Sequence, residues 1–213
     1  MSAPRTADVL RRFTAPRSAA AAEERCDLCK SPLAGEHPHL VDVASRRLLC
    51  ACAPCALLFD HRGASAGRHK RVPTERRRLR DLRLGADFWE RLQIPVRLAF
   101  IFENSDVQKM VAFYPGPAGA TESLLPLDAW REAVAANPVL GTIASDVEAV
   151  LLRDREGAPP ECYLVPIDVC YALTGLVRSS WKGFEGGEEA WQRIDRFFAD
   201  LDASARDVSG GAR

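Results

Sequence analysis

Five of the seven cysteines in this 213-residue chain lie between residues 26 and 55, and four of them form two Cys-x-x-Cys pairs. The first pair is Cys26 and Cys29, the second is Cys52 and Cys55, and 22 residues lie between the two pairs. Each short turn delivers two sulfurs to one side, so two such pairs suit tetrahedral thiolate coordination. The spacing predicts a metal site with these four ligands, and buried cysteines without a metal are the alternative.

A fifth thiol, Cys50, lies two residues before Cys52. Residues two apart on a strand face the same side, so Cys50 is an alternative ligand or the fifth sulfur of an iron–sulfur site. We place Cys52 in the site because the pair it forms with Cys55 repeats the spacing of the first pair. His37 and His39 are near enough to be further alternative ligands, but we expect both at strand ends or in loops.

Zinc is the metal that we expect, with iron as the alternative, because ligand identity alone does not separate the two. Rubredoxin-like knuckles usually continue with glycine, and here Lys30 and Ala56 follow the two pairs, which argues against a redox role. Four protein sulfurs leave no open position for water or substrate. The site is therefore expected to hold the module together rather than to catalyse.

The residues between the two pairs predict a β-hairpin that would bring them together. Two apolar runs, 39–43 and 47–52, flank the polar turn Ala-Ser-Arg. The order knuckle, hairpin, knuckle predicts a zinc-ribbon-like module over residues 24–61.

Charge divides the chain, although its formal net charge is zero. Residues 1–83 hold 17 Lys and Arg against 9 Asp and Glu, whereas residues 84–213 hold 12 against 20. We therefore predict a disordered tail over 1–23, the metal module, a basic linker over 62–83, a larger domain over 84–205 and a flexible tail over 206–213.

The basic linker, with nine Lys and Arg, could follow a nucleic-acid backbone. It contains no aromatic residue to stack on bases, so nucleic-acid binding is the less favoured interpretation. We expect its arginines to line a solvated connector or to meet acidic groups on this chain or a partner.

The larger domain shows the periodicity of strands and helices in the order ββαββαα. Strands are predicted within 94–104, 109–115, 146–154 and 161–167, and helices within 125–137, after Asp168 as N-cap, and after Gly186-Gly187. Residues 114–123 are expected to form a loop. Because the strands meet by hairpins, we predict an α+β fold in which helices cover one side of an antiparallel sheet.

Catalytic chemistry is sparse in the larger domain, because all four histidines lie at or before residue 69. Cys162 and Cys170 fall on apolar positions and are expected to be buried and inert. We therefore expect no intrinsic enzymatic turnover. Trp181 and Phe184, in a Gly-rich segment between two predicted helices, are candidate partner-binding residues, since aromatic side chains are common interface hot spots; packing into the core is the alternative.

No apolar run approaches the roughly 20 residues that cross a bilayer. The N-terminal segment is rich in Arg and Ala without a continuous apolar stretch, so a secretory signal is not expected. Clustered thiols at metal-ligand spacing then indicate a reducing cytoplasm.

Four segments carry a family resemblance: CDLC, HLVDVASRRLLCACAPCALLF, VAFYPGPAGATES and LVPIDVCYALTGLVRSSWKGFEGGEEAW. Together they resemble an uncharacterised bacterial family whose members are often encoded beside actinobacterial-type [NiFe] hydrogenases. The resemblance covers roughly residues 24–203 and implies accessory or assembly work with a hydrogenase subunit or maturation factor. A rubredoxin-like or iron–sulfur electron carrier is the first alternative, and a zinc-ribbon nucleic-acid-binding protein is the second.

Overall fold

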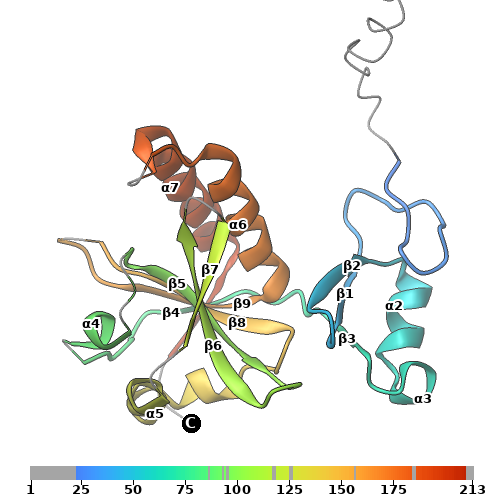
Figure 1. Cartoon of the computed structure of the whole chain (residues 1–213), viewed down its shortest axis with the longest axis horizontal. Coiled ribbons are helices and arrows are strands. Elements are labelled where there is room, and N and C mark those ends of the chain that lie inside the picture. The colour runs from blue at the N-terminus through green and yellow to red at the C-terminus, as the bar shows by residue number, and fades with distance from the viewer. Residues whose placement is uncertain are drawn as a thin grey trace, which may run out of the picture.

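Two β-sheets organise the residues that the computed structural model describes, which are 23–209 without 86, 93, 95, 117–118, 125–126, 156 and 184–185. A three-stranded sheet forms the core of the N-terminal module, and a seven-stranded sheet forms the larger domain (Figure 1). The α+β class predicted from sequence is confirmed. Apart from Glu23, the predicted N-terminal tail lies outside the described residues.

The small sheet contains the predicted hairpin. Strand β1 (His39–Asp42) pairs antiparallel with β2 (Arg47–Cys50), so that His39 lies opposite Cys50. The turn between them uses Arg46 at a positive φ of 56°. A third strand, β3 (His69–Arg71), pairs with the other edge of β1 and gives the order β2-β1-β3.

Helix α2 (Ala53–Asp60) starts directly after Cys52, which is its N-cap residue, and the short α3 (Arg62–Ser65) follows it. A zinc ribbon takes both ligand pairs from turns, whereas here Cys55 lies in the first turn of a helix. The order here is knuckle, hairpin, helix. The module therefore resembles a ribbon in its knuckle and hairpin, and differs from one at the second cysteine pair.

The large sheet has the strand order β10-β4-β9-β8-β5-β6-β7. Its neighbours pair antiparallel except for β10 and β4, which are parallel. The strands are β4 (Arg77–Leu79), β5 (Leu98–Asn104), β6 (Lys109–Gly116), β7 (Gly119–Leu124), β8 (Glu148–Arg153), β9 (Glu161–Pro166) and β10 (Arg206–Val208).

Helices cover both faces of this sheet, so the prediction that they cover one side is wrong. The long α6 (Ile167–Ser180) and α7 (Gly187–Ser204) lie on one face, and α4 (Phe88–Leu92), α5 (Leu127–Ala136) and the 3-10 helix η1 (Pro138–Thr142) contribute to the core on the other (Figure 1). Neighbouring residues of β8 are buried on opposite faces of the sheet. Leu151 belongs to the buried cluster that includes residues of α6 and α7, and Val150 belongs to the cluster that includes residues of α4, α5 and η1. Two separate apolar layers therefore hold the domain together.

Three segments expected to be irregular contribute strands. The basic segment 62–83 contains α3, β3 and β4, and so it links both sheets through backbone hydrogen bonds instead of forming a solvated connector. The predicted C-terminal tail begins with β10, which pairs with β4. Residues 114–123, expected to be a loop, form parts of the β6–β7 hairpin.

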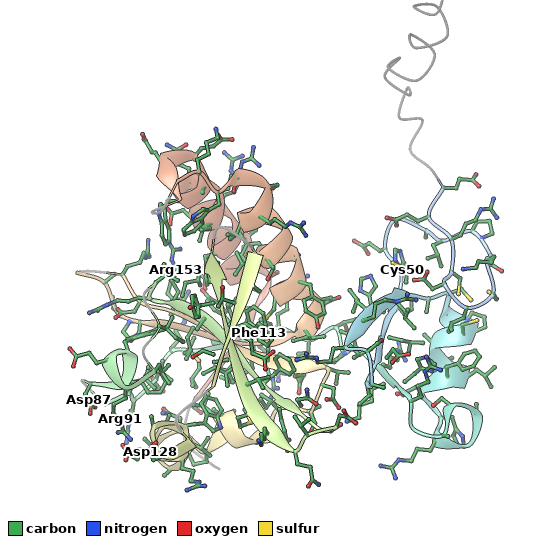
Figure 2. The ribbon with its side chains drawn as sticks, in the orientation of Figure 1. Cys50, Asp87, Arg91, Phe113, Asp128 and Arg153 are labelled. Atoms are coloured by element: carbon green, nitrogen blue, oxygen red, sulfur yellow. The ribbon has the colours of Figure 1, made fainter. Side chains whose placement is uncertain are left out.

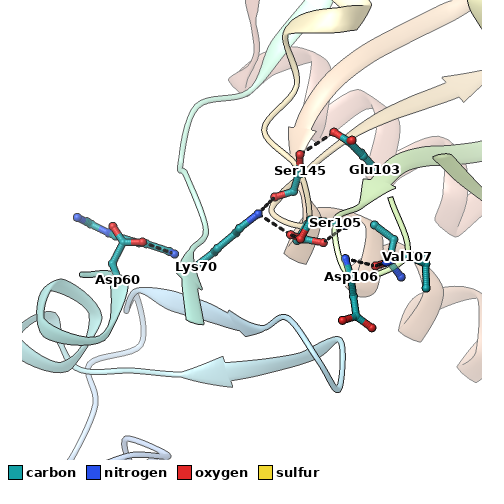
Figure 3. Close-up of polar contacts among 10 residues, drawn as sticks. Asp60, Lys70, Glu103, Ser105, Asp106, Val107 and Ser145 are labelled. Atoms are coloured by element: carbon teal, nitrogen blue, oxygen red, sulfur yellow. Dashed lines mark hydrogen bonds and ion pairs between the residues drawn. The ribbon is translucent and has the colours of Figure 1, made fainter. Parts of the chain in front are cut away.

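The two parts of the chain share packing and polar contacts. Val41 and Val72 of the N-terminal module belong to the same buried cluster as Phe100 of β5. Lys70 on β3 reaches across to the Ser145 carbonyl and the Asp146 carboxylate (Figure 3). The module is thus fixed against the sheet domain at β3. No helix among the described residues is long and apolar enough to cross a membrane.

Candidate metal centre

The four predicted ligands come together at the start of helix α2. The sulfurs of Cys26, Cys29, Cys52 and Cys55 all lie within 4.8 Å of one another. Cys29 Sγ and Cys52 Sγ are 3.6 Å apart, close to the roughly 3.8 Å edge of a tetrahedron with 2.3 Å zinc–sulfur bonds. Cys26 is fully buried and Cys29 is exposed, so the cluster lies between the core of the module and its surface.

The first knuckle is held by its own backbone. Cys26 N–H donates to the Ser31 carbonyl, and Lys30 N–H donates to the Cys26 carbonyl, both at 2.8 Å. Lys30 adopts a positive φ of 64°, the conformation that glycine adopts most readily. The absence of glycine after the first pair therefore no longer argues against iron, because the knuckle forms with Lys30 at this position.

Hydrogen bonds favour the thiolate form on the knuckle side of the cluster. The Ser31 side chain is the largest influence on Cys29, whose pKa is lowered to about 6. Burial raises the pKa of Cys26, but backbone N–H groups of Cys29, Cys52 and Leu28 lower it, and the net shift is downward. Thiolate sulfurs are the form that binds metal.

Cys55, on the helix side of the cluster, has its pKa shifted in the opposite direction. Burial and the neighbouring sulfurs raise the pKa of Cys55 well above its usual value. Several thiolates packed within a few ångströms repel one another, and a dication removes that repulsion. The donor set therefore fits a metal ion with four sulfur ligands.

Cys50 does not belong to this cluster. Its side chain groups with His37 and His39, whose possible ligand atoms and the Cys50 sulfur lie within 4.8 Å of one another. The expectation that Cys50 and Cys52 face the same side is wrong, because the strand ends at Cys50 and Cys52 already begins a helix. Figure 2 shows Cys50 on the part of the module that faces the larger domain.

Asp168 also differs from its predicted role. The N-terminus of α6 has Pro166 as its N-cap, without a side-chain cap, and Asp168 lies in the first turn. Its Oδ2 lies 2.8 Å from Nδ1 of His39, 129 residues away in the chain. Sequence reasoning missed the grouping of His37, His39 and Cys50; the signal was the His-x-His pair opposite a cysteine in the predicted hairpin.

The predicted partner-binding aromatic residues are only partly described. Phe184 lies outside the described residues. Trp181 is half-buried, packs against the core beside Trp191 with ring centroids 6.0 Å apart, and donates from its indole nitrogen to the Gly183 carbonyl. Part of this ring therefore supports the fold, and its role towards a partner stays a prediction.

The basic segment pairs with acidic groups of the same chain. Lys70, Arg77 and Arg78 form ion pairs with Asp146, Glu148 and Asp202. These contacts neutralise much of the charge that a nucleic-acid backbone would need. Cys162 and Cys170, predicted to be buried, are fully buried, and burial raises the pKa of both thiols, so neither is a reactive nucleophile.

The fold and the site define a class: an α+β protein with a cysteine-rich finger module whose four sulfurs are placed to bind a metal ion. The model of one protein family, described as "Family of unknown function (DUF5947)", matches residues 25–205. The chain belongs to this family. A comparison with curated proteins and one with solved structures gave no match.

Proposed function

We propose that this protein is a zinc-binding, non-catalytic accessory or assembly protein that acts in the cytoplasm through contacts with another protein. The observation that carries the proposal is the closed cluster of four sulfurs, which leaves a bound ion no open coordination position. Such an ion stabilises a fold and presents a surface. It does not itself take part in turnover.

The size of the module's own core supports a structural role for the metal. The buried cluster around the cysteines contains only five residues, namely Cys26, Leu40, Leu49, Ala51 and Ala56. A core this small rarely maintains a fold unaided, and small domains commonly depend on a structural metal. Zinc fits this role because it forms stable tetrahedral thiolate sites without redox chemistry.

The metal content of freshly isolated protein tests this proposal. We expect zinc in elemental analysis, and we expect the ion of the four-sulfur cluster to be lost in Cys52→Ser and retained in Cys50→Ser. Iron with a visible thiolate-to-iron charge-transfer band would instead favour the rubredoxin-like electron carrier. Protein without any metal would contradict both interpretations.

Exposed apolar side chains on the finger module support a protein partner. Leu57 and Leu58 on α2 are 63% and 57% exposed, and they lie two and three residues after Cys55. Two adjacent exposed leucines offer an apolar contact that a partner could cover. The candidate partner, a [NiFe] hydrogenase subunit or maturation factor, rests on the resemblance described above.

Co-expression with the hydrogenase subunits and maturation factors of the source organism tests the partner. We expect one of them to co-purify with the wild-type chain, and Leu57→Ser/Leu58→Ser to weaken this at unchanged metal content. Trp181→Ala/Phe184→Ala tests the aromatic segment in the same way. If a folded double variant retains the partner fully, the residues substituted in it are not part of the binding surface. If no hydrogenase protein co-purifies with the wild type, the hydrogenase association is contradicted.

A further inference from the structure

A second group of metal-binding side chains lies beside the four-sulfur cluster. His37, His39 and Cys50 each offer a ligand atom, and these atoms lie within 4.8 Å of one another. The strand pairing explains the arrangement, because His39 lies opposite Cys50 in the β1–β2 ladder. His37 lies just before β1 and packs its ring against that of His39, with centroids 5.0 Å apart.

Hydrogen bonds prepare both imidazoles to bind a metal through the same nitrogen. Nδ1 of His39 lies 2.8 Å from Asp168 Oδ2, and Nδ1 of His37 lies 2.9 Å from the Ala34 carbonyl. Since both partners are acceptors, Nδ1–H is the donor in each pair, and in the neutral imidazole Nε2 then keeps the lone pair that a metal needs. This is the arrangement found around metal-ligating histidines, which donate their other N–H to a carboxylate or backbone carbonyl.

A buried atom without a partner supports a bound ion over an ordinary core histidine. The His37 side chain is only 8% exposed, and its Nε2 is buried without a hydrogen-bond partner among the described residues. A buried polar nitrogen left unsatisfied costs stability, so native structures seldom retain one. A metal ion bound to Nε2 would remove this cost.

We propose that His37, His39 and Cys50 bind a second transition-metal ion, with Asp168 orienting His39, and that this ion has a coordination position open to a small external ligand. Two imidazoles and one thiolate select zinc, cobalt and other late first-row metals over magnesium or calcium. Three protein ligands are the number typical of zinc sites that exchange a ligand, in contrast to closed sites with four.

A cavity beside the histidines provides room for such a ligand. It has a volume of about 270 Å³ and is lined by residues of both parts of the chain, among them His37, His39, Arg71, Thr74 and Asp168. Its lining carries both charges, with Arg71 on one side and the carboxylates of Glu36 and Asp168 on the other. The cavity therefore offers room for a small ligand without selecting its charge.

Metal titration of the full chain under reducing conditions tests the second site. We expect the wild type to bind two Co²⁺ or Zn²⁺ ions and Cys50→Ser or His39→Gln to bind one, with the four-sulfur charge-transfer spectrum of the first cobalt unchanged. His61→Gln is the matched control, because His61 is exposed and outside the group, and it should still bind two ions. One ion in the wild type, or two in the folded His39 and Cys50 variants, would overturn the proposal.

Two further measurements separate the parts of the proposal. Asp168→Ala should weaken the second site about 10- to 100-fold while the first keeps its affinity. Azide should shift the visible bands of the second cobalt ion and leave those of the four-sulfur ion unchanged. An unchanged spectrum in azide would overturn the open position, and equal affinity in Asp168→Ala would overturn the orienting role. The count of two ions does not depend on the partner proposed above, so each idea can fail alone.

Discussion

Asp27 and Cys50 bind each other twice: the Asp27 N–H donates to the Cys50 carbonyl at 2.8 Å, and the Cys50 N–H donates to the Asp27 carboxylate at 2.9 Å. Asp27 lies inside the first knuckle, between two ligands of the four-sulfur cluster. Cys50 belongs to the histidine-containing group. The pair therefore joins the two candidate metal sites through one segment of backbone.

Replacing this carboxylate should loosen the four-sulfur site. In Asp27→Ala the Cys50 N–H loses its acceptor, and a net hydrogen bond at such an exposed site contributes about 0.5 to 1.5 kcal/mol. We expect zinc to leave the variant faster than it leaves the wild type, measured with a chromogenic chelator. Asp27→Asn keeps an acceptor oxygen and should lie between the two. Equal release rates for all three proteins would show that the pair does not hold the knuckle.

Metal removal should affect the finger module before it affects the large sheet. The module has its own small core, whereas the sheet domain has two apolar layers of its own. With a chelator present, we expect hydrogen exchange to rise at least tenfold for amides within residues 24–60. Amides of β5 and β8 should stay protected. Uniform loss of protection across the chain would instead mean that the two parts fold as one unit.

Arg153 at the end of β8 should be a large single contributor to stability. Its side chain is only 5% exposed, forms ion pairs with Asp195 and Glu161, and lies over the ring of Phe198 at 4.7 Å (labelled in Figure 2). Without Arg153, the largely buried carboxylate of Glu161 keeps only Arg155, whereas Asp195 is 54% exposed and stays solvated. We expect Arg153→Ala to lower the free energy of unfolding by about 2 kcal/mol in urea denaturation, through Glu161 and the lost contact with Phe198.

Arg155 provides the matched control for Arg153. It also pairs with Glu161, but its side chain is 50% exposed. Exposed ion pairs contribute little, so Arg155→Ala should change the free energy of unfolding by less than about 1 kcal/mol. Similar losses in both variants would mean that burial of Arg153 does not decide its effect.

Local patterns were sufficient to predict the central elements. The apolar runs around 98–104 and 148–153, the hairpin of the finger module and the amphipathic helix after Gly186 all form where the sequence places them. The grouping of four cysteines was also readable, because spacing of two residues within each pair is a local property. Coverage of both sheet faces had a signal too: residues 149–152 of β8 form a continuous apolar run, which is typical of burial on both faces.

Features that depend on distant residues could not be read in the same way. The strands β3, β4 and β10 are only three residues long, and they form because a partner edge is already in place. Likewise the contact between His39 and Asp168 joins residues 129 positions apart. No periodicity records such a contact, and so Asp168 looked like an ordinary helix cap.

The ion pair between Lys70 and Asp146 should decide how firmly the finger module is fixed to the sheet domain. Lys70 Nζ lies 2.6 Å from Asp146 Oδ2, and the Asp146 side chain is only 5% exposed. The same carboxylate accepts from the N–H and hydroxyl of Ser105, so it ties β3 to the turn after β5 (Figure 3). Lys70→Met keeps the apolar stem but removes this charge, and we expect it to destabilise the protein by about 1 to 3 kcal/mol.

Two substitutions of Asp146 separate its charge from its backbone conformation. Asp146 has a positive φ of 71°, which asparagine tolerates better than alanine does. Asp146→Asn retains acceptors for Ser105 and should cost about as much as Lys70→Met, whereas Asp146→Ala loses every acceptor and should cost more. Urea denaturation gives the free energies, and hydrogen exchange at β3 reports whether the module detaches. If Asp146→Asn and Lys70→Met are both as stable as the wild type, the ion pair does not fix the module, and packing around Val41 and Val72 holds it instead.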